Sequence, residues 1–180
     1  MARIAIVFGS VDGHTARVAE RIGATLVRAG HAVDVAPAGP PGAADSLAQY
    51  DAVIVGSSIR YGHHRPQVEA LVRANLGAIV ARPNAFFSVS LSAGGPGARP
   101  AAASGFVEEF VERTGWQPRS VALFAGALRY THYNPFIRFM MRLIVGAAGG
   151  ETDTSRDYEY TDWDAVDRFA EAFAQPLQRT

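Results

Sequence analysis

The sequence predicts an α/β fold in which helices cover both faces of a doubly wound, five-stranded parallel sheet. Short apolar runs bounded by turn residues recur along the chain, and most are continuous rather than alternating, as in strands buried on both faces. Segments with helical spacing lie between these runs. With 180 residues, 48% of them hydrophobic, the chain can bury one substantial core, so we expect a single domain over residues 1–180.

The predicted strands and helices alternate along the chain. The strands are expected at residues 3–8, 31–36, 52–56, 85–91 and 120–127, and the helices at residues 14–29, 67–80, 106–114 and 161–177. The first helix is the clearest, because apolar residues recur every four positions from Val18 and Gly30 supplies a stop. Thr161 is the expected N-cap of the last helix. Residues 37–47 are too rich in Pro and Gly for a helix.

The composition excludes several classes of function. The 17 basic and 17 acidic residues cancel, which gives no reason to expect a nucleic-acid partner. The chain contains no cysteine, which excludes disulfides, thiolate nucleophiles and cysteine metal sites, and we predict no metal site. It also contains no lysine, which excludes Schiff-base chemistry and the lysine-containing phosphate loop of nucleotide hydrolases.

The N-terminal sequence predicts the location of the protein. It starts directly on a strand pattern, without a charged segment followed by a longer apolar stretch, so we expect no cleaved signal. No apolar run reaches about 18 residues, the length that a membrane-spanning helix needs. We therefore expect a cytoplasmic protein.

The stretch FGSVDGHT, residues 8–15, is the first candidate site. It lies between a predicted strand and a predicted helix, where free N-terminal amides of a helix bind anions. Its donors are backbone amides and the hydroxyls of Ser10 and Thr15, and Gly13 permits close backbone approach. Such a loop suits the phosphate of a mononucleotide cofactor, with FMN as the leading candidate. The alternative is an ordinary turn capped by Ser10 or Thr15.

The stretch GSSIRYGHH, residues 56–64, is the second candidate site and is expected to form one turn at the same edge of the sheet. Ile59 and Tyr61 would expose apolar area there unless a flat ligand ring covers them. Tyr61 could provide a wall for an isoalloxazine ring, and Arg60 could stabilise the reduced anion of that ring.

The histidines and serines of this edge have two interpretations each. His63 and His64 are expected to be solvated loop residues, with a catalytic role as the alternative. The stretch SVSLSAGGPG, residues 88–97, is expected as a loop after the fourth strand. Its serines either form a strand end with hydroxyls on one face or provide the second wall of a flavin site, with Leu91 against the ring edge.

Residues 129–152 form an insertion between the last predicted strand and the last helix, where doubly wound folds usually need a short connection. Within it, Arg138 and Arg142 are the polar stripe of an otherwise apolar helix over residues 136–145. Such a helix can be a core helix, a dimer face, a lid over a hydrophobic substrate or an interfacial membrane helix. Its Met and Phe content favours an adaptable surface that meets lipid or a large apolar ligand.

Together these motifs resemble one family in order and spacing. They are SVDGHT, GSSIRYGHH, FFSVSLSA, AGALRYTHYNPFIRFMMRLI, GGETDT and YTDWDAVDRFA. Over residues 3–173 the chain resembles the flavodoxin-like protoporphyrinogen IX dehydrogenases that use menaquinone as acceptor. The resemblance implies a flavodoxin-like sheet of strand order 2-1-3-4-5 with an insertion after the fifth strand.

The resemblance also implies an activity and its partners. The chain would bind FMN tightly and oxidise protoporphyrinogen IX to protoporphyrin IX in haem biosynthesis, a six-electron reaction. The electrons would pass to a membrane quinone, menaquinone or ubiquinone, through peripheral contact with the inner face of the cell membrane. A homodimer is a further expected use of the inserted helix.

The same resemblance assigns site residues. The cofactor residues are Ser10, Val11, Asp12, Gly13, His14 and Thr15 at the phosphate, and Ser57, Ser58, Ile59, Arg60, Tyr61, Gly62, Ser88, Val89, Ser90, Leu91, Ser92 and Ala93 at the ring. The substrate or membrane residues are Arg129, Tyr130, Phe136, Arg138, Phe139, Met140 and Arg142. The catalytic candidates are Arg60, His63 and Arg129. A tetrapyrrole with two propionates would find Arg60, Arg129 and Arg138 beside apolar surface. No general base is evident, because flavin accepts hydride and protons can leave to water.

Three other functions fit the same fold class. A flavodoxin-type electron carrier would usually present a strongly acidic docking face, whereas this chain is neutral with Arg and His in its expected flavin loops. An NAD(P)H:quinone reductase would oxidise a nicotinamide cofactor rapidly. A binding module without flavin is the third alternative, and fold alone does not separate these functions.

Overall fold

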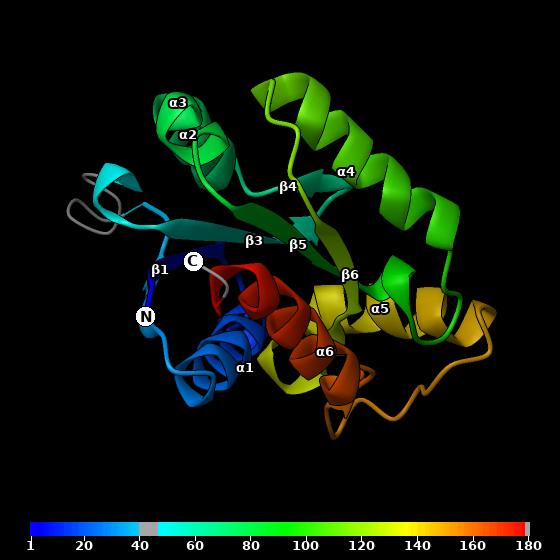
Figure 1. The fold of residues 1–180 in the computed structure, drawn as a ribbon. Helices are drawn as coiled ribbons and strands as arrows, with labels where there is room; N and C mark the ends of the chain where they lie inside the picture. Colours follow the sequence, from blue (N-terminus) through cyan, green and yellow to red (C-terminus); the bar gives the residue numbers. More distant parts are fainter. Residues whose placement is uncertain (40–46, 179–180) are drawn as a thin grey trace.

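The computed structural model describes residues 1–39 and 47–178, and a parallel sheet with helices on both faces forms its centre (Figure 1). The parallel strands are β1 (Arg3–Gly9), β2 (Ala32–Pro37), β3 (Ala52–Arg60), β5 (Asn84–Ser90) and β6 (Val121–Ala125). Their order is β2-β1-β3-β5-β6, and the short β4 (His63–His64) pairs antiparallel with β3. The predicted doubly wound order is therefore confirmed. Most of the Pro- and Gly-rich segment, residues 40–46, lies outside the described residues.

Helices cover the two faces of the sheet in separate layers (Figure 1). One layer holds α1 (His14–Arg28) and α6 (Trp163–Ala174); the other holds α2 (Pro66–Ala74), α3 (Leu76–Val80) and α4 (Pro100–Thr114). Short 3-10 turns lie at Leu47–Gln49, Leu91–Ala93, Tyr130–His132 and Gln175–Gln178. Successive side chains of a strand point to opposite faces, so Ile4 and Ile6 pack toward α1 and α6, while Ala5 and Val7 pack toward α2 and α4.

The three central strands are buried on both faces, as their continuous apolar runs predict, but the edge strands are not. Val35 on β2, and Val121 and Leu123 on β6, are 37–45% exposed.

Gly56 on β3 is required by close packing within the sheet. A Cβ at this position would lie 2.0 Å from the ring of Phe87, its neighbour in register on β5. The aromatic side chain thus fills the space that a larger residue on β3 would occupy.

Two predicted helices have different bounds in the structure. The helix expected over residues 67–80 is divided into α2 and α3 at Asn75. This residue leaves the helical conformation with φ −115°, and its side-chain amide donates to the carbonyl of Leu71. The helix expected over residues 106–114 begins earlier, at Pro100. Proline is compatible with the first helical turn, so the Pro- and Gly-rich stretch before it does not delay the helix.

The N-cap predicted for the last helix is also wrong. Asp162, not Thr161, caps α6, because the Asp162 carboxylate accepts from the amide of Ala165 at 3.0 Å. The hydroxyl of Thr161 donates instead to the carbonyl of Ala125 at 2.8 Å. The Thr161 side chain therefore links the segment before α6 to the end of β6 and does not cap the helix.

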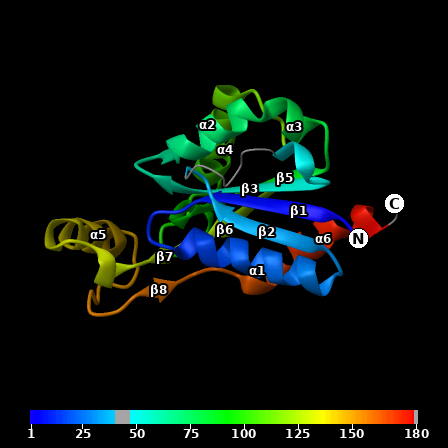
Figure 2. The ribbon, with the colours of Figure 1, turned by 90° about the vertical axis from the view of Figure 1, so that its left-hand side faces the viewer.

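The insertion between β6 and α6 extends away from the sheet layers (Figure 2). It contains β7 (Ala127–Leu128), α5 (Pro135–Ala147) and β8 (Tyr158–Glu159), and β7 pairs antiparallel with β8 in a separate small sheet. The prediction that residues 136–145 form a helix is confirmed, and the core-helix alternative is wrong because α5 buries only Val145. A Cβ at Gly150 would lie 2.4 Å from Pro96, so glycine at this position lets the insertion approach the loop before α4 closely.

Candidate functional site

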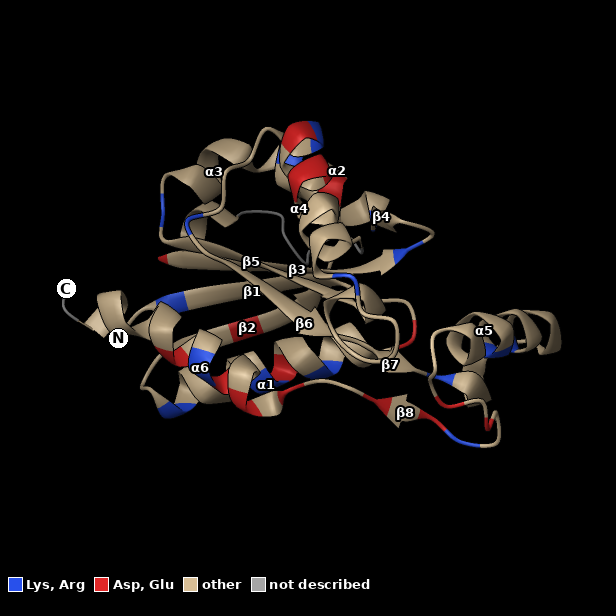
Figure 3. Ribbon diagram, turned by 90° about the vertical axis from the view of Figure 1, so that its right-hand side faces the viewer, with Lys and Arg blue, Asp and Glu red and all other residues tan. Residues whose placement is uncertain are grey.

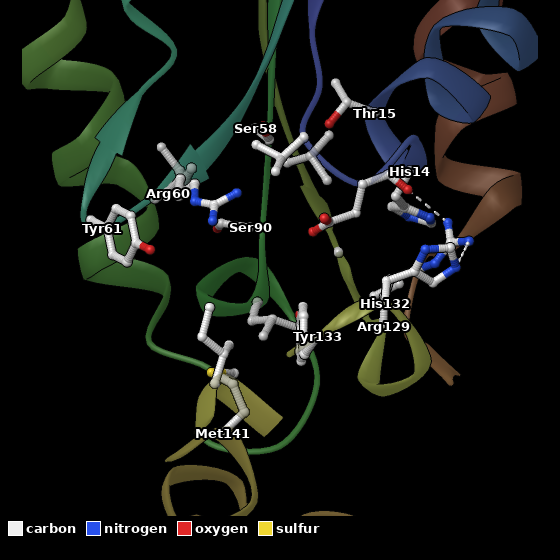
Figure 4. A pocket seen from close by; sticks show the side chains of 18 of the residues that line it. His14, Thr15, Ser58, Arg60, Tyr61, Ser90, Arg129, His132, Tyr133 and Met141 are labelled. Atoms are coloured by element: carbon white, nitrogen blue, oxygen red, sulfur yellow. Dashed lines mark hydrogen bonds between the residues drawn. The ribbon is translucent and has the colours of Figure 1, made fainter. Parts of the chain in front are cut away.

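A cavity of about 880 Å³ lies at the carboxyl ends of β1, β3 and β5, at the sheet edge that the fold class predicts (Figure 4). It lies between the loop after β1, the β3–β4 hairpin and the insertion. Its lining residues are Ser10, Val11, Asp12, His14, Thr15, Ser58, Ile59, Arg60, Tyr61, Gly62, Val89, Ser90, Leu91, Ser92, Phe106, Gly126, Ala127, Arg129, His132, Tyr133, Asn134, Phe136, Ile137, Met140, Met141 and Ile144. One cavity therefore joins the anion-binding turn to the inserted helix.

The loop before α1 leaves the first turn of the helix open to a ligand. Gly13 is the N-cap and has φ +80°, and no side chain caps the helix. The Ser10 hydroxyl accepts from the Gly13 amide at 3.1 Å, so it shapes the turn instead of capping the helix. The alternative of a turn capped by Ser10 or Thr15 is therefore wrong. The amides that open a helix have no partner within it, and here they remain free for an anion.

The segment predicted as one turn over residues 56–64 is a β-hairpin, because β3 continues to Arg60 and pairs with β4. Tyr61 and Gly62 form the tip with φ values of +53° and +84°. Two positive φ values are typical of a type I′ turn, which Gly adopts freely and Tyr adopts at a cost of about 1 kcal/mol. Tyr61 is 81% exposed at the edge of the cavity. The Arg60 guanidinium lies 5.2 Å from its ring centre.

The two histidines of the hairpin have different environments. His63 lies outside the cavity and pairs with Glu109 at 3.0 Å. His64 is 4% exposed and packs edge-on against the stacked rings of Phe86 and Phe110, so its predicted solvation is wrong. Burial lowers the pKa of His64 to about 4, and this side chain is neutral at pH 7.

Two serines near the end of β5 have different environments. Ser88 is buried and lies 2.9 Å from Nε2 of His64, so its hydroxyl faces away from the cavity. Ser90 lines the cavity, and its buried hydroxyl has no hydrogen-bond partner among the described residues. β5 ends at Ser90 and a 3-10 turn follows, so the predicted loop begins later than expected. Ser90 thus presents an unused polar group to a ligand.

Arg129 connects the insertion to the loop before α1. Its Nη1 donates to the carbonyl of Asp12 at 2.9 Å (Figure 4). Its Nε lies 3.4 Å from the Asp157 carboxylate. Its Nη2 lies 3.0 Å from Nε2 of His132. Both terminal nitrogens of this guanidinium therefore have partners within the protein, and an ion pair with Asp157 partly balances its charge.

The helix α5 forms one wall of the cavity and also has an exposed surface. Phe136, Ile137, Met140, Met141 and Ile144 line the cavity. Phe136, Phe139, Met140, Leu143 and Ile144 are 45–71% exposed, and we call these five the apolar face of α5. The Arg138 guanidinium is bound by the segment before α5, where it donates to the carbonyls of Tyr130 and Tyr133.

Some predicted site residues do not line the cavity. Ser57 is buried, and its hydroxyl accepts from the Arg65 amide. Tyr130 is buried and donates to the carbonyl of Glu151. The other predicted residues outside the lining are Gly13, His63, Ser88, Ala93, Arg138, Phe139 and Arg142. The roles assigned to the predicted residues that do line the cavity stay predictions.

The prediction omitted several residues that line the cavity. Ile137, Met141 and Ile144 follow Phe136 and Met140 on one side of α5, so helical spacing could have identified them. Tyr133 and His132 carry no such signal, because the chain between β7 and α5 has no regular period. Phe106 lies on α4, which covers the other face of the sheet from α1, and only the tertiary fold brings it to the cavity.

Comparison with known proteins shows similarity over nearly the whole chain. The flavodoxin domain family matches residues 5–155. The protoporphyrinogen IX dehydrogenase (quinone) of Escherichia coli strain K12 is 36% identical over 169 residues, which cover 94% of this chain and 93% of that protein. The protein of the same name from Leishmania major is 37% identical over 174 residues, covering 94% of this chain and 73% of that protein. Among solved structures, oxidised flavodoxin 2 from Bacillus cereus shares the fold with a TM-score of 0.59, at 20% identity, over 97% of this chain and 99% of that chain.

Proposed function

Because the chain belongs to the flavodoxin-like protoporphyrinogen IX dehydrogenases (quinone), we propose that it oxidises protoporphyrinogen IX to protoporphyrin IX with bound FMN and passes the electrons to a quinone. The substrate loses six hydrogen atoms in this reaction. Three quinones each accept two of them and become quinols, so the reaction balances over three turnovers. The observation that best supports this function is the single cavity that joins an open helix N-terminus to the apolar wall of α5.

The described residues fit FMN at this cavity. The uncapped first turn of α1 offers amides to the phosphate, and Gly13 keeps the approach free of a side chain. The buried hydroxyl of Ser90 lacks a partner and can bond to a polar edge of the ring system. Ile59 and Tyr61 offer an aliphatic and an aromatic surface to a flat ring. A cavity of about 880 Å³ is also near the upper end of the usual range for ligand sites, which leaves room for a second flat molecule.

The chain binds and positions its ligands, and the cofactor supplies the redox chemistry. When bound, FMN accepts two electrons from one molecule and delivers them to another. The loop before α1 holds the phosphate and thereby fixes one end of the cofactor. The β3–β4 hairpin and the end of β5 hold the ring in the cavity, where Tyr61 shields it from water. No side chain is assigned as a general base, and protons leave through the open side of the cavity.

The substrate wall combines apolar side chains with a cation. A tetrapyrrole has an apolar body that the cavity side of α5 can cover, with Phe136, Ile137 and Met141 in contact. Arg60 is exposed and forms no ion pair among the described residues, so it is available for a propionate. Arg129 is less suited to this role because Asp12 and Asp157 already bind its guanidinium.

The apolar face of α5 is proposed to contact the inner face of the cell membrane, where the quinone is dissolved. None of the helices within residues 1–39 and 47–178 is both long enough and apolar enough to cross a bilayer. Residues 113–150 contain no Asp or Glu, and the side chains that border the apolar face on α5 are Arg (Figure 3). An apolar surface bordered by cations is typical of helices that lie in an anionic lipid interface. Since the same helix lines the cavity, this orientation would place the cavity beside the lipid.

An anaerobic assay tests the activity. FMN-loaded protein is mixed with protoporphyrinogen IX and a soluble menaquinone analogue, and porphyrin fluorescence is followed against flavin-free protein. Fluorescence should rise only when flavin and quinone are both present. Arg60→Gln should raise the KM for the porphyrinogen about tenfold with a smaller change in kcat, whereas Arg119→Gln, at the opposite end of the sheet, should change neither.

Three outcomes of this assay would contradict the proposal. Protein that holds FMN but forms no porphyrin above the control would favour an electron carrier. Rapid oxidation of NADH or NADPH without porphyrin formation would favour a quinone reductase. An unchanged KM in Arg60→Gln would exclude Arg60 as the propionate partner.

A further inference from the structure

The hydrogen bonds of His14 determine which ring nitrogen carries the proton. His14 is the first residue of α1 and is 6% exposed (Figure 4). Its Nε2 lies 2.6 Å from Oγ1 of Thr161, which in turn lies 2.8 Å from the carbonyl oxygen of Ala125. A carbonyl cannot donate, so the one hydroxyl proton goes to Ala125 and the hydroxyl accepts from Nε2–H of His14. Nδ1 of the neutral ring is therefore a bare acceptor.

This bare acceptor is buried at the place where a phosphate would bind. Nδ1 of His14 has no hydrogen-bond partner among the described residues, and His14 lines the cavity beside the uncapped first turn of α1. An unused buried acceptor is costly, so native proteins rarely keep one without a ligand or a function. A phosphate dianion has only acceptors, and two facing acceptors repel each other unless a proton lies between them.

The surroundings keep the free imidazole neutral. Burial is the largest influence and lowers the pKa of His14; Glu159 on β8 raises it, and Arg17 on α1 and Arg129 in the insertion lower it further. The ring of Trp163 on α6 packs against the imidazole with centroids 6.1 Å apart and adds no charge. A bound phosphate would add negative charge on the Nδ1 side and favour protonation.

We propose that the phosphate of FMN binds to this chain together with one proton from solvent, which is held between Nδ1 of His14 and a phosphate oxygen. This inference rests on the proposed function, because it takes FMN as the ligand. The second pKa of a phosphate monoester is about 6, so free FMN is mainly a dianion above pH 7 and brings no proton of its own. The only bond formed or broken is the one to this proton.

Calorimetry of the full chain, freed of flavin and titrated with FMN, measures the proton directly. Titrations at pH 7.5 in two phosphate-free buffers with different ionisation enthalpies give the number of protons taken up. The expected value for the unaltered chain is about one, and the affinity should fall by up to about tenfold per pH unit between pH 7 and 8.5. Riboflavin, which lacks the phosphate, should bind without proton uptake.

Matched variants separate His14 from its surroundings. His14→Gln keeps an amide that can donate to Thr161 but cannot titrate, so FMN binding should take up almost no proton and should vary little with pH. Thr161→Val removes the acceptor that holds the proton on Nε2. The neutral ring can then donate from Nδ1, and proton uptake should decrease. Thr161→Ser keeps the hydroxyl and should restore the uptake.

The outcomes distinguish this inference from the proposed function. FMN binding with no proton uptake by the unaltered chain would overturn the inference and leave the cofactor in place. Equal uptake by the unaltered chain and by His14→Gln would also overturn it, because the proton would then reside elsewhere. A chain that binds no FMN at any pH would overturn the proposed function and this inference with it.

Discussion

Replacing Phe139 and Leu143 with Asp should abolish binding to anionic membranes without unfolding the protein. The two side chains are 59% and 58% exposed and neither lines the cavity. They lie about one turn apart on the apolar face of α5. Because they contact little of the protein, each substitution should change the free energy of unfolding by no more than about 0.5 kcal/mol.

The expected loss of membrane affinity follows from the exposed fractions. Full burial of a Phe or Leu side chain contributes about 1.5–3 kcal/mol. Scaled by the 59% and 58% that are exposed, insertion of both contributes roughly 2–3.5 kcal/mol in total. Since about 1.4 kcal/mol corresponds to a factor of ten, the double variant should bind membranes about 30- to 300-fold more weakly.

Co-sedimentation with vesicles that contain one-third anionic lipid measures this affinity. The matched control is Val27→Asp with Val121→Asp, because these residues are 55% and 45% exposed, in the last turn of α1 and at the start of β6, and neither lines the cavity. The control should bind vesicles like the unaltered chain. Equal binding by the unaltered chain and the Phe139/Leu143 variant would refute the assignment of this face to the membrane. If the unaltered chain instead forms a dimer that the Asp variant loses, the apolar face is a contact between two copies.

Three further predictions concern cofactor binding and stability. Tyr61→Asn should leave the flavin-free protein as stable as before or up to about 1 kcal/mol more stable in urea unfolding, because Asn tolerates positive φ. The same substitution should weaken FMN binding, which flavin fluorescence measures. Asn84→Ala should destabilise by about 2–4 kcal/mol in urea unfolding, since buried Asn84 bonds to Nε1 of Trp116 and to three backbone groups; a loss below 1 kcal/mol would contradict this. Hydrogen bonds from Arg21 hold the pKa of Asp167 at about 2, below its ordinary value near 4. Because the folded-state pKa is lowered, this stabilisation is present above pH 4 and lost as the pH falls toward 2. Asp167→Asn should therefore lower the midpoint of thermal unfolding at pH 7, and the difference should shrink below pH 4.

Local sequence determined the strands, the first helix and the edge at which the cavity lies. The apolar runs of β1, β3 and β5 predict strands buried on both faces, since a central parallel strand needs apolar side chains on both sides. The glycine before α1 and the apolar repeat from Val18 are local signals, and a local signal does not depend on the rest of the chain. The motifs of the insertion indicated the family for the same reason. The alternation of strands and helices predicted the doubly wound class, and the family resemblance implied the order of the strands.

Tertiary structure decided which predicted residues meet and which side chains face a ligand. β3 continues past Gly56 because β4 folds back to pair with it, a partner that the spacing of apolar residues does not show. Arg129 bonds to the carbonyl of Asp12 across 117 residues of sequence, and His14 bonds to Thr161 across 147. The exposure of α5 depends equally on the rest of the chain. Its composition fits a core helix or a surface helix. It is exposed because other helices already cover both faces of the sheet. Contacts between distant segments are set by packing of the whole chain, so the sequence determined the elements, whereas the structure determined how the site is assembled from them.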